Sequence, residues 1–368
     1  SYYQNMIANV ILGFILLAII PFYSGNILIQ FCILGLAVLW LVAPYIMYRI
    51  SRANLLINSV DLLDKSEKEY LMDIAQRTWN FFKENLTKES NFLPPDNFQE
   101  DRKPKLVYRT SPTNIGLAML SVIASYDLKI ASLNDTIKLL ENMINTVVEL
   151  QKWNGHLYNW YDIKTLNPLE PKYISSVDSG NFIGYLYVVK QFLEENKEKY
   201  QIIDSLIEQI DKVIVNTDFS KLYNPDNMLF SIGFNVEENS LTDSYYDLLA
   251  SEARQTSIIA IAKKDVDIKH WKNLSRTLTK LKQYKGLLSW SGTAFEYLMP
   301  NINIPQYPGS LLDESCKFMI MSQKEYAKLL NIPWGFSEAA FNLKDLNNNY
   351  QYKAFGIPWL GLKRGLAD

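Results

Sequence analysis

The sequence predicts an all-α protein in which two membrane-spanning helices precede an α/α toroid, a ring of helical hairpins around a central cleft. Residues 1–48 contain no charged side chain. After them, segments that are apolar on all sides alternate with segments that are apolar on one face only. The chain offers fewer such segments than a closed ring of hairpins needs, so we expect a toroid that is incomplete at its C-terminal end.

The N-terminal region holds two apolar stretches, residues 6–22 and 27–48, on either side of a turn-like segment at residues 23–26. Each stretch approaches the ~20 residues that cross a bilayer. A signal peptide would have a basic start and one short apolar run. We therefore expect a hairpin that crosses the lipid bilayer twice, with burial against other protein as the alternative. The hairpin is followed by the basic residues Arg49, Arg52 and Lys65. Because basic residues next to a membrane span favour the cytoplasmic side, we expect the rest of the chain to lie in the cytoplasm.

The soluble part is expected to comprise a linker with one helix (residues 51–105) and the toroid (residues 106–368), after a membrane region of residues 1–50. Helical spacing predicts the linker helix over residues 66–86. Residues 112–126 and 178–193 are apolar nearly all round and are predicted as inner helices. Residues 134–150 and 202–215 have one apolar face and are predicted as outer helices. The pattern continues over residues 244–262, 270–282 and 310–330, and some strand is expected near residues 228–236.

Composition limits the function. The 37 basic and 39 acidic residues give a net charge of −2, which provides no broad basic surface for nucleic acid. With two cysteines and two histidines, neither a disulfide framework nor a metal site is expected, and we expect no cofactor. Aromatic residues make up 13% of the chain. They suit either a large core or a cleft on whose flat faces sugar rings pack.

Three runs are rich in polar and aromatic residues, at residues 109–114, 155–162 and 177–181, and several of these runs lie where a predicted inner helix begins. Helix starts present unpaired N–H groups, and several such ends around one cleft can bind a hydroxyl-rich ligand. Simple capping is the alternative for each run. The candidate ligand-binding residues are Arg109, Asn114, Tyr158, Trp160, Tyr161, Asp162, Asp178 and Asn181.

Four glutamates lie in apolar or aromatic surroundings: Glu252, Glu296, Glu314 and Glu338. Carboxylates are seldom buried without a partner or a task. Cleavage of a glycosidic bond needs one carboxylic acid to protonate the leaving oxygen and a second carboxylate as nucleophile or base. Paired glutamates fit this reaction, and the alternative for each is a structural ion pair with Arg254, Lys317 or Lys353.

The local settings predict different roles for two of these glutamates. Glu252 lies among leucine and alanine residues, where desolvation raises the pKa and favours a general acid. Glu338 follows Ser337 at a predicted helix start, where the helix dipole favours an ionised nucleophile. The separation of the two carboxyl groups decides between retention and inversion of the anomeric configuration.

Over about residues 39–368, the chain resembles the middle portion of bacterial cyclic β-1,2-glucan synthases, because many long sequence runs match in the same order. These are membrane enzymes that build cyclic glucans from UDP-glucose. The matching runs are residues 93–99, 109–117, 155–162, 177–181, 243–254, 287–300, 311–316, 333–342 and 351–365.

The resemblance implies a glucoamylase-like α/α toroid between an upstream membrane glucosyltransferase and a downstream phosphorylase-like domain of the same synthase, in the bacterial inner membrane. It implies an anomer-retaining transglycosylase that cuts a linear β-1,2-glucan chain and joins its ends. The essential glutamates of the family match Glu252 as acid/base and Glu338 as nucleophile. Further candidates for substrate binding are Arg254, Trp290, Glu296 and Trp334.

Two departures limit what the resemblance implies. The residues with which the family uses UDP-glucose are absent from this chain, so polymerisation is not expected of it. The family domain also continues for further helices. Two other functions stay open at this point: a β-1,2-glucanase that lets water attack, and a noncatalytic module that holds the glucan.

Overall fold

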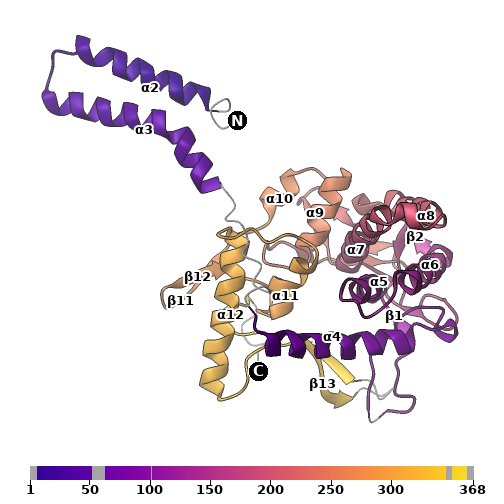
Figure 1. Ribbon diagram of the computed structural model, residues 1–368. Coiled ribbons are helices and arrows are strands. Elements are labelled where there is room, and N and C mark those ends of the chain that lie inside the picture. The colour runs from indigo at the N-terminus through magenta and orange to yellow at the C-terminus, as the bar shows by residue number, and fades with distance from the viewer. Residues whose placement is uncertain (1–5, 52–62, 101, 345–349, 363–368) are drawn as a thin grey trace. The chain divides into compact units, whose positions relative to one another are not determined.

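The computed structural model describes residues 6–51, 63–100, 102–344 and 350–362. The chain divides into two compact units, Ser1–Leu63 and Asp64–Asp368, which are described separately below. Figure 1 shows the N-terminal unit as a helical hairpin and the second unit as a body of helices and short strands.

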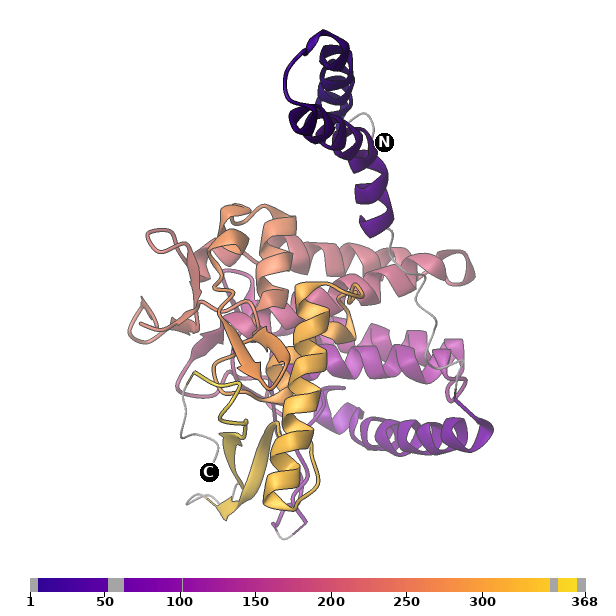
Figure 2. The same ribbon diagram turned by 90° about the vertical axis from the view of Figure 1, so that its left-hand side faces the viewer.

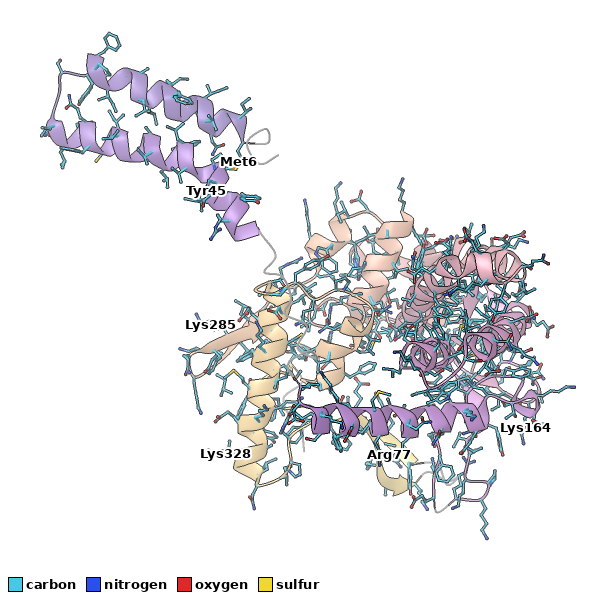
Figure 3. All side chains as sticks on the ribbon, in the orientation of Figure 1. Met6, Tyr45, Arg77, Lys164, Lys285 and Lys328 are labelled. Atoms are coloured by element: carbon cyan, nitrogen blue, oxygen red, sulfur yellow. The ribbon has the colours of Figure 1, made fainter. Side chains whose placement is uncertain are left out.

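The N-terminal unit consists of α2 (Ile7–Ile19), the 3₁₀ turn η1 (Ile20–Phe22) and α3 (Ile27–Ser51). α2 and α3 pack antiparallel, so that Met6 and Tyr45 lie toward the same end (Figure 3). Gly13 allows their close approach, because an added Cβ would lie 2.7 Å from Leu41 Cγ. Among the described residues, one helix, Ile27–Arg49, is long and apolar enough to cross a membrane, and the apolar helix Ile7–Phe22 is shorter. The expected helical hairpin is present.

The helices at the start of the second unit follow the predicted boundaries closely. α4 (Lys65–Asn85) begins with a capping box, in which Asp64 accepts a hydrogen bond from Glu67 N and the Glu67 side chain accepts one from Asp64 N. α5 (Pro112–Asp127) begins at Ser111, whose hydroxyl accepts from Asn114 N. Three further helices match predicted segments: α6 (Leu133–Glu149), α7 (Ser176–Glu195) and α8 (Ile203–Asn216).

These helices form two rows (Figure 2). α5 packs on α7, and α7 on α9 (Arg254–Lys263), whereas α6 and α8 cover this row from outside. α5 and α7 are buried on most sides, while α6 and α8 bury one face. The inner contact is close at Gly180, where an added Cβ would lie 2.0 Å from Thr256 Oγ1. The predicted alternation of inner and outer helices is confirmed for this part of the chain.

The remaining helical elements belong mainly to the later half of the unit. α12 (Leu311–Leu330) confirms the helix predicted at residues 310–330. A second hydrophobic core, separate from that of the helical rows, packs beneath α12. The shorter helices are η3 (Lys88–Ser90), η4 (Lys197–Lys199), η5 (Phe219–Leu222), α10 (Lys269–Asn273), α11 (Ala294–Leu298) and η6 (Met299–Ile302).

Short antiparallel strands correct the all-α prediction. Four pairs form two-stranded sheets: β1 (Arg109–Thr110) with β4 (Tyr161–Asp162), β2 (Lys152–Trp153) with β3 (His156–Leu157), β11 (Leu278–Leu281) with β12 (Tyr284–Leu287), and β13 (Glu338–Lys344) with β14 (Tyr350–Ala354). In two three-stranded sheets, β8 (Gly233–Asn235) lies between β5 (Tyr173–Ser175) and β9 (Ser240–Leu241), and β7 (Leu229–Ser231) lies between β6 (Tyr223–Asn224) and β10 (Tyr245–Tyr246). β7 and β8 confirm the strand expected near residues 228–236.

Two predicted helices are wrong over much of their length. In residues 244–262 the helix begins only at Arg254, because Tyr245 and Tyr246 pair with Ser231 and Phe230 in a sheet. In residues 270–282, α10 ends at Asn273 and the chain forms the β11–β12 hairpin instead. In the first case pairing with β7, and in the second pairing with the strand that directly follows, overrides the local helical pattern.

Candidate active site

Three glutamates from distant parts of the chain line one cavity of about 340 Å³ in the second unit. Glu252 lies just before α9, Glu296 lies in α11, and Glu338 is the first residue of β13. The remaining lining residues are Ile232, Ser244, Tyr245, Tyr246, Ser251, Trp290, Ser291 and Ala354. We call this site the three-glutamate cavity.

Glu252 is half-buried, and its neighbours Ala250, Ser251 and Ala253 are buried. Burial and, to a smaller extent, the negative charge of Glu296 raise the pKa of Glu252 to about 7. Ser251 Oγ donates a hydrogen bond of 3.2 Å to Glu252 Oε2, which partly opposes this shift. The raised pKa expected from the apolar setting of Glu252 is therefore present.

Glu338 corrects a prediction. It begins a strand opposite Ala354, not a helix, so no helix dipole holds its carboxylate ionised. The preceding residues Phe336 and Ser337 hydrogen-bond to the first turn of α11 rather than starting a helix of their own. Burial, followed by the charges of Glu252 and then Glu296, raises the pKa of Glu338 to about 8.

Glu296 is buried, and its carboxylate is surrounded by hydrogen-bond donors. Oε1 accepts from the backbone N–H groups of Trp290 and Ser291, at 2.9 and 3.1 Å. Oε2 accepts from Ser289 Oγ and from the N–H and hydroxyl of Thr293, at 2.9, 2.9 and 3.1 Å. A carboxylate only accepts hydrogen bonds, so the ionised form satisfies all five donors. Glu296 therefore stands as a fixed negative charge beside Glu252.

Arg254 lies outside the cavity lining and is 3% exposed. Its guanidinium donates to the carbonyl oxygens of Ser251, Glu296 and Tyr297, at 2.9, 2.8 and 2.6 Å. Burial lowers its pKa to about 10. These contacts tie the segment carrying Glu252 to α11, so the structure places Arg254 in support of the glutamates. Glu314, by contrast, forms an exposed ion pair with Lys317, as the structural alternative predicted.

A second polar group forms where α5 begins. The Arg109 guanidinium bonds Asp96 at 3.1 Å and lies 4.4 Å from the ring centre of Trp160. Asn114 Nδ2 donates to the other oxygen of Asp96 at 3.2 Å. Asp96, Arg109, Asn114 and Trp160 are called the helix-start cluster below. The structure thus brings together three of the residues predicted to bind ligand, around an aspartate that sequence reasoning missed.

The other predicted binding residues near α7 have roles within the fold. Asp178 Oδ2 accepts from Asn159 Nδ2 at 3.1 Å, and Asn181 Nδ2 donates to Thr113 Oγ1 at 3.1 Å. Tyr161 is fully buried, and its hydroxyl bonds the carbonyl of Gln151.

The other predicted residues lie in different settings: Tyr158 is buried, Asp162 lies in a turn, and the two tryptophans lie inside and outside the cavity lining. The Tyr161 hydroxyl also accepts from the backbone N–H of Tyr158, at 2.9 Å. Asp162 closes a turn by accepting from the backbone N–H groups of Lys164 and Thr165. Trp334 lies outside the cavity lining and is 51% exposed, whereas Trp290 lines the cavity.

Tyr246 is a cavity residue that was not predicted. It lines the cavity, and burial raises its pKa well above the ordinary value, assisted by the charges of Glu252, then Asp178, and also Glu338. Asp178 at the start of α7 therefore lies within electrostatic reach of the cavity. The aromatic pair Tyr245 and Tyr246 was the available signal, and its assignment to a helix concealed it.

Solved structures share the fold of this chain. An endo-β-1,2-glucanase from Chitinophaga pinensis, in complex with sophorotriose and glucose, aligns with a TM-score of 0.65 over 78% of this chain and 73% of that chain, at 11% identity. An endo-β-1,2-glucanase from Talaromyces funiculosus, in complex with sophorose, gives 0.61 over 79% and 71%, at 12% identity. A Bacteroides fragilis structure with a provisional glucoamylase assignment gives 0.65 over 78% and 73%, at 14% identity. The fold is glucoamylase-like.

Sequence comparison finds a relative of higher identity than these solved structures. The chain is 32% identical, over 91% of its length, to the cyclic β-(1,2)-glucan synthase NdvB of Rhizobium meliloti strain 1021. The chain is related to cyclic β-1,2-glucan synthases. The resemblance expected from the sequence runs is confirmed, although the chain spans only 16% of the length of this relative. No protein-family model matches the chain.

Proposed function

We propose that the chain is a retaining transglycosylase domain of a cyclic β-1,2-glucan synthase, which cuts linear β-1,2-glucan in the three-glutamate cavity and cyclises it. Glu338 attacks the anomeric carbon while Glu252 gives its proton to the leaving oxygen, so the glycosidic bond breaks as the glycosyl–enzyme bond forms. Glu252 then takes the proton from a hydroxyl of the same glucan. That hydroxyl displaces Glu338 and closes the ring.

The observation that carries this proposal is the meeting of two glutamates of raised pKa beside a third that is fixed as an anion. Neighbouring carboxyls cannot all ionise easily, so the pair of Glu252 and Glu338 retains a proton near neutral pH. The charge of Glu296 raises the pKa of both members of the pair. Glu338 has the higher pKa, about 8 against about 7 for Glu252, so in the ligand-free chain the shared proton lies on Glu338. The assigned roles require this proton to pass to Glu252 when the glucan binds, which leaves Glu338 as the ionised nucleophile.

The glucan would extend from the cavity toward the helix-start cluster. Trp290 lines the cavity, and Trp160 and Arg109 are partly exposed. Together they offer flat faces and polar donors to the uncharged, hydroxyl-rich chain. Of the other predicted binding residues, we propose Asp178 and Asn181 as supports of this surface and Trp334 as an outlying contact.

Product analysis tests the proposal. Purified chain is incubated with linear β-1,2-glucan, and products are separated by mass, because a ring weighs one water less than the linear chain of equal length. We expect cyclic products from the wild type, and a loss of them in Glu252→Gln and Glu338→Gln. Glu314→Gln, at the exposed ion pair, is the matched control and should cyclise normally. Undiminished cyclisation by either active-site variant would remove that residue from the mechanism.

Hydrolysis is the second candidate, because the structural neighbours include endo-β-1,2-glucanases. In this reaction water takes the place of the acceptor hydroxyl. In ¹⁸O-labelled water, a hydrolase places the label at the new reducing end, whereas a transglycosylase leaves its cyclic product unlabelled. Labelled linear products without any ring would favour the hydrolase.

The remaining expectations concern the setting of the domain. We propose that α2 and α3 both cross the bacterial inner membrane, that residues 51–105 link them to a toroid of residues 106–368, and that this part faces the cytoplasm. We also propose that a glucosyltransferase upstream and a phosphorylase-like domain downstream act on the same glucan. Alkaline extraction of membranes tests the anchor, since a chain that crosses the bilayer stays in the membrane pellet.

A further inference from the structure

The β11–β12 hairpin carries an unusual concentration of positive charge. Residues 268–295 hold six lysine or arginine residues and no acidic residue, although the whole chain has a net charge of −2. Three of the six lie in the hairpin, at Lys280, Lys282 and Lys285. Figure 1 shows β11 and β12 projecting from the body of the second unit, and Figure 3 labels Lys285 on this hairpin.

Side-chain alternation gives the hairpin two different faces. Gly286 faces α12, where an added Cβ would lie 2.4 Å from the Phe318 ring, and Thr279 donates to the carbonyl of Trp359. The opposite face carries exposed Lys280 and Lys285, with Leu278, 54% exposed, nearer the body of the unit, where its cross-strand partner Leu287 is buried.

The outer face holds a repulsive pair. Lys280 lies directly opposite Lys285 in the antiparallel register. Like charges in that position destabilise a strand pair. Within the described part of the chain, Lys282 is paired with Glu325 at 2.6 Å, but no ion pair joins Lys280 or Lys285 to an acid. An external anionic surface would relieve this repulsion.

We infer that this outer face of the β11–β12 hairpin, with Lys280, Lys285 and Leu278, binds the anionic headgroups of a lipid bilayer. Lysine heads attract acidic lipids, and a leucine among them can enter the headgroup region. The inference rests on the membrane anchoring by α2 and α3 proposed above, which would keep a bilayer close to this unit. Charge complementarity favours lipid over an uncharged glucan.

Proteolysis in nanodiscs tests this contact with the full chain. Trypsin cleavage after Lys282 is followed by mass spectrometry in discs of phosphatidylcholine alone and of phosphatidylcholine with phosphatidylglycerol. Two lysines at an anionic surface predict about thirtyfold slower cleavage in the acidic discs. High salt should abolish the difference. Cleavage after Lys164, in a turn between β4 and β5, serves as the internal reference.

Reversing the charge of the two outer lysines provides a second test of the lipid contact. Lys280→Glu/Lys285→Glu should make the cleavage rate after Lys282 equal in the two discs. The control Lys138→Glu/Lys212→Glu, with the same net charge change on α6 and α8, should keep the difference. The inference would be overturned if wild-type cleavage after Lys282 were equally fast in the two discs, or if the slower cleavage persisted after charge reversal and in high salt. Either result would indicate that the hairpin contacts a protein partner or has no partner. A chain that does not enter nanodiscs would refute the anchoring, and the inference with it.

Discussion

The helix-start cluster and the three-glutamate cavity are both polar and partly buried, but negative charge is balanced by a basic residue in the first and is not balanced in the second. In the cluster, the positive charge of Arg109 balances the negative charge of Asp96, and Asn114 donates a hydrogen bond to Asp96. In the cavity, none of the three glutamates forms an ion pair with a described residue, and the pKa of Glu252 and of Glu338 is raised. A neutralised cluster can hold an uncharged ligand, whereas crowded carboxyls can hold a proton and release it.

The largest expected effect tests which carboxyl in the cavity is the nucleophile. Glu338→Ala should lower kcat roughly 10⁴-fold or more, because no glycosyl–enzyme bond can form. Added azide should restore turnover by attacking the anomeric carbon from the vacated side, giving a glycosyl azide of inverted configuration. In Glu252→Ala, azide should instead give a product of retained configuration, visible by NMR. An exchange of the two outcomes would reverse the assigned roles.

Glu296 tests whether a fixed anion sets the proton on Glu252. Glu296→Gln removes a charge that raises the pKa of Glu252, so that pKa should fall. The basic limb of the kcat/KM profile should then move to lower pH, with kcat reduced about 10²-fold at neutral pH.

Ser289→Ala is the matched control, because it removes one of the five donors to Glu296 but leaves the charge. The amide in Glu296→Gln also leaves donors unmatched, which costs about 1–3 kcal/mol of stability. Lower activity with an unshifted pH profile would assign Glu296 a structural role only.

Arg109 tests whether the helix-start cluster contacts the glucan. Arg109→Ala removes a donor beside the Trp160 face, so KM for β-1,2-glucan should rise about tenfold while kcat stays unchanged. Lys172→Ala, which breaks a comparable ion pair with Glu170, is the control and should leave KM unaltered. A fall in kcat without a change in KM would contradict a binding role.

The smallest expected effect is on stability. Glu338 binds its proton more tightly in the folded state than in the unfolded state, because its pKa is raised. The free energy of unfolding should therefore fall as the pH rises from about 4.5, the ordinary value, to about 8, and then level off.

Urea denaturation at pH 4.5 and pH 9 measures this slope. The side chain introduced in Glu338→Gln does not titrate. Between these two pH values, the free energy of unfolding of this variant should therefore rise by about 1–2 kcal/mol relative to that of the wild type, after allowance for solvent screening. The exposed Glu314→Gln should keep the wild-type slope. If the free energy of unfolding of Glu338→Gln depended on pH as it does in the wild type, folding would not raise the pKa of Glu338.

The sequence by itself determined the features that depend on neighbours along the chain. The start of α5 after Ser111 and the single apolar faces of α6 and α8 follow from side chains within a few residues. The apolar setting of Glu252 was readable for the same reason.

Only the tertiary structure decided which segments pair and which carboxyls meet. Tyr245 joins a sheet because Ser231 lies opposite it, and Glu338 begins a strand because Ala354 supplies its partner. The proximity of Glu252, Glu296 and Glu338 depends on contacts between residues far apart in sequence. Strand pairing and burial are nonlocal, so no local pattern encodes them, and the chemistry assigned to the cavity depends on both.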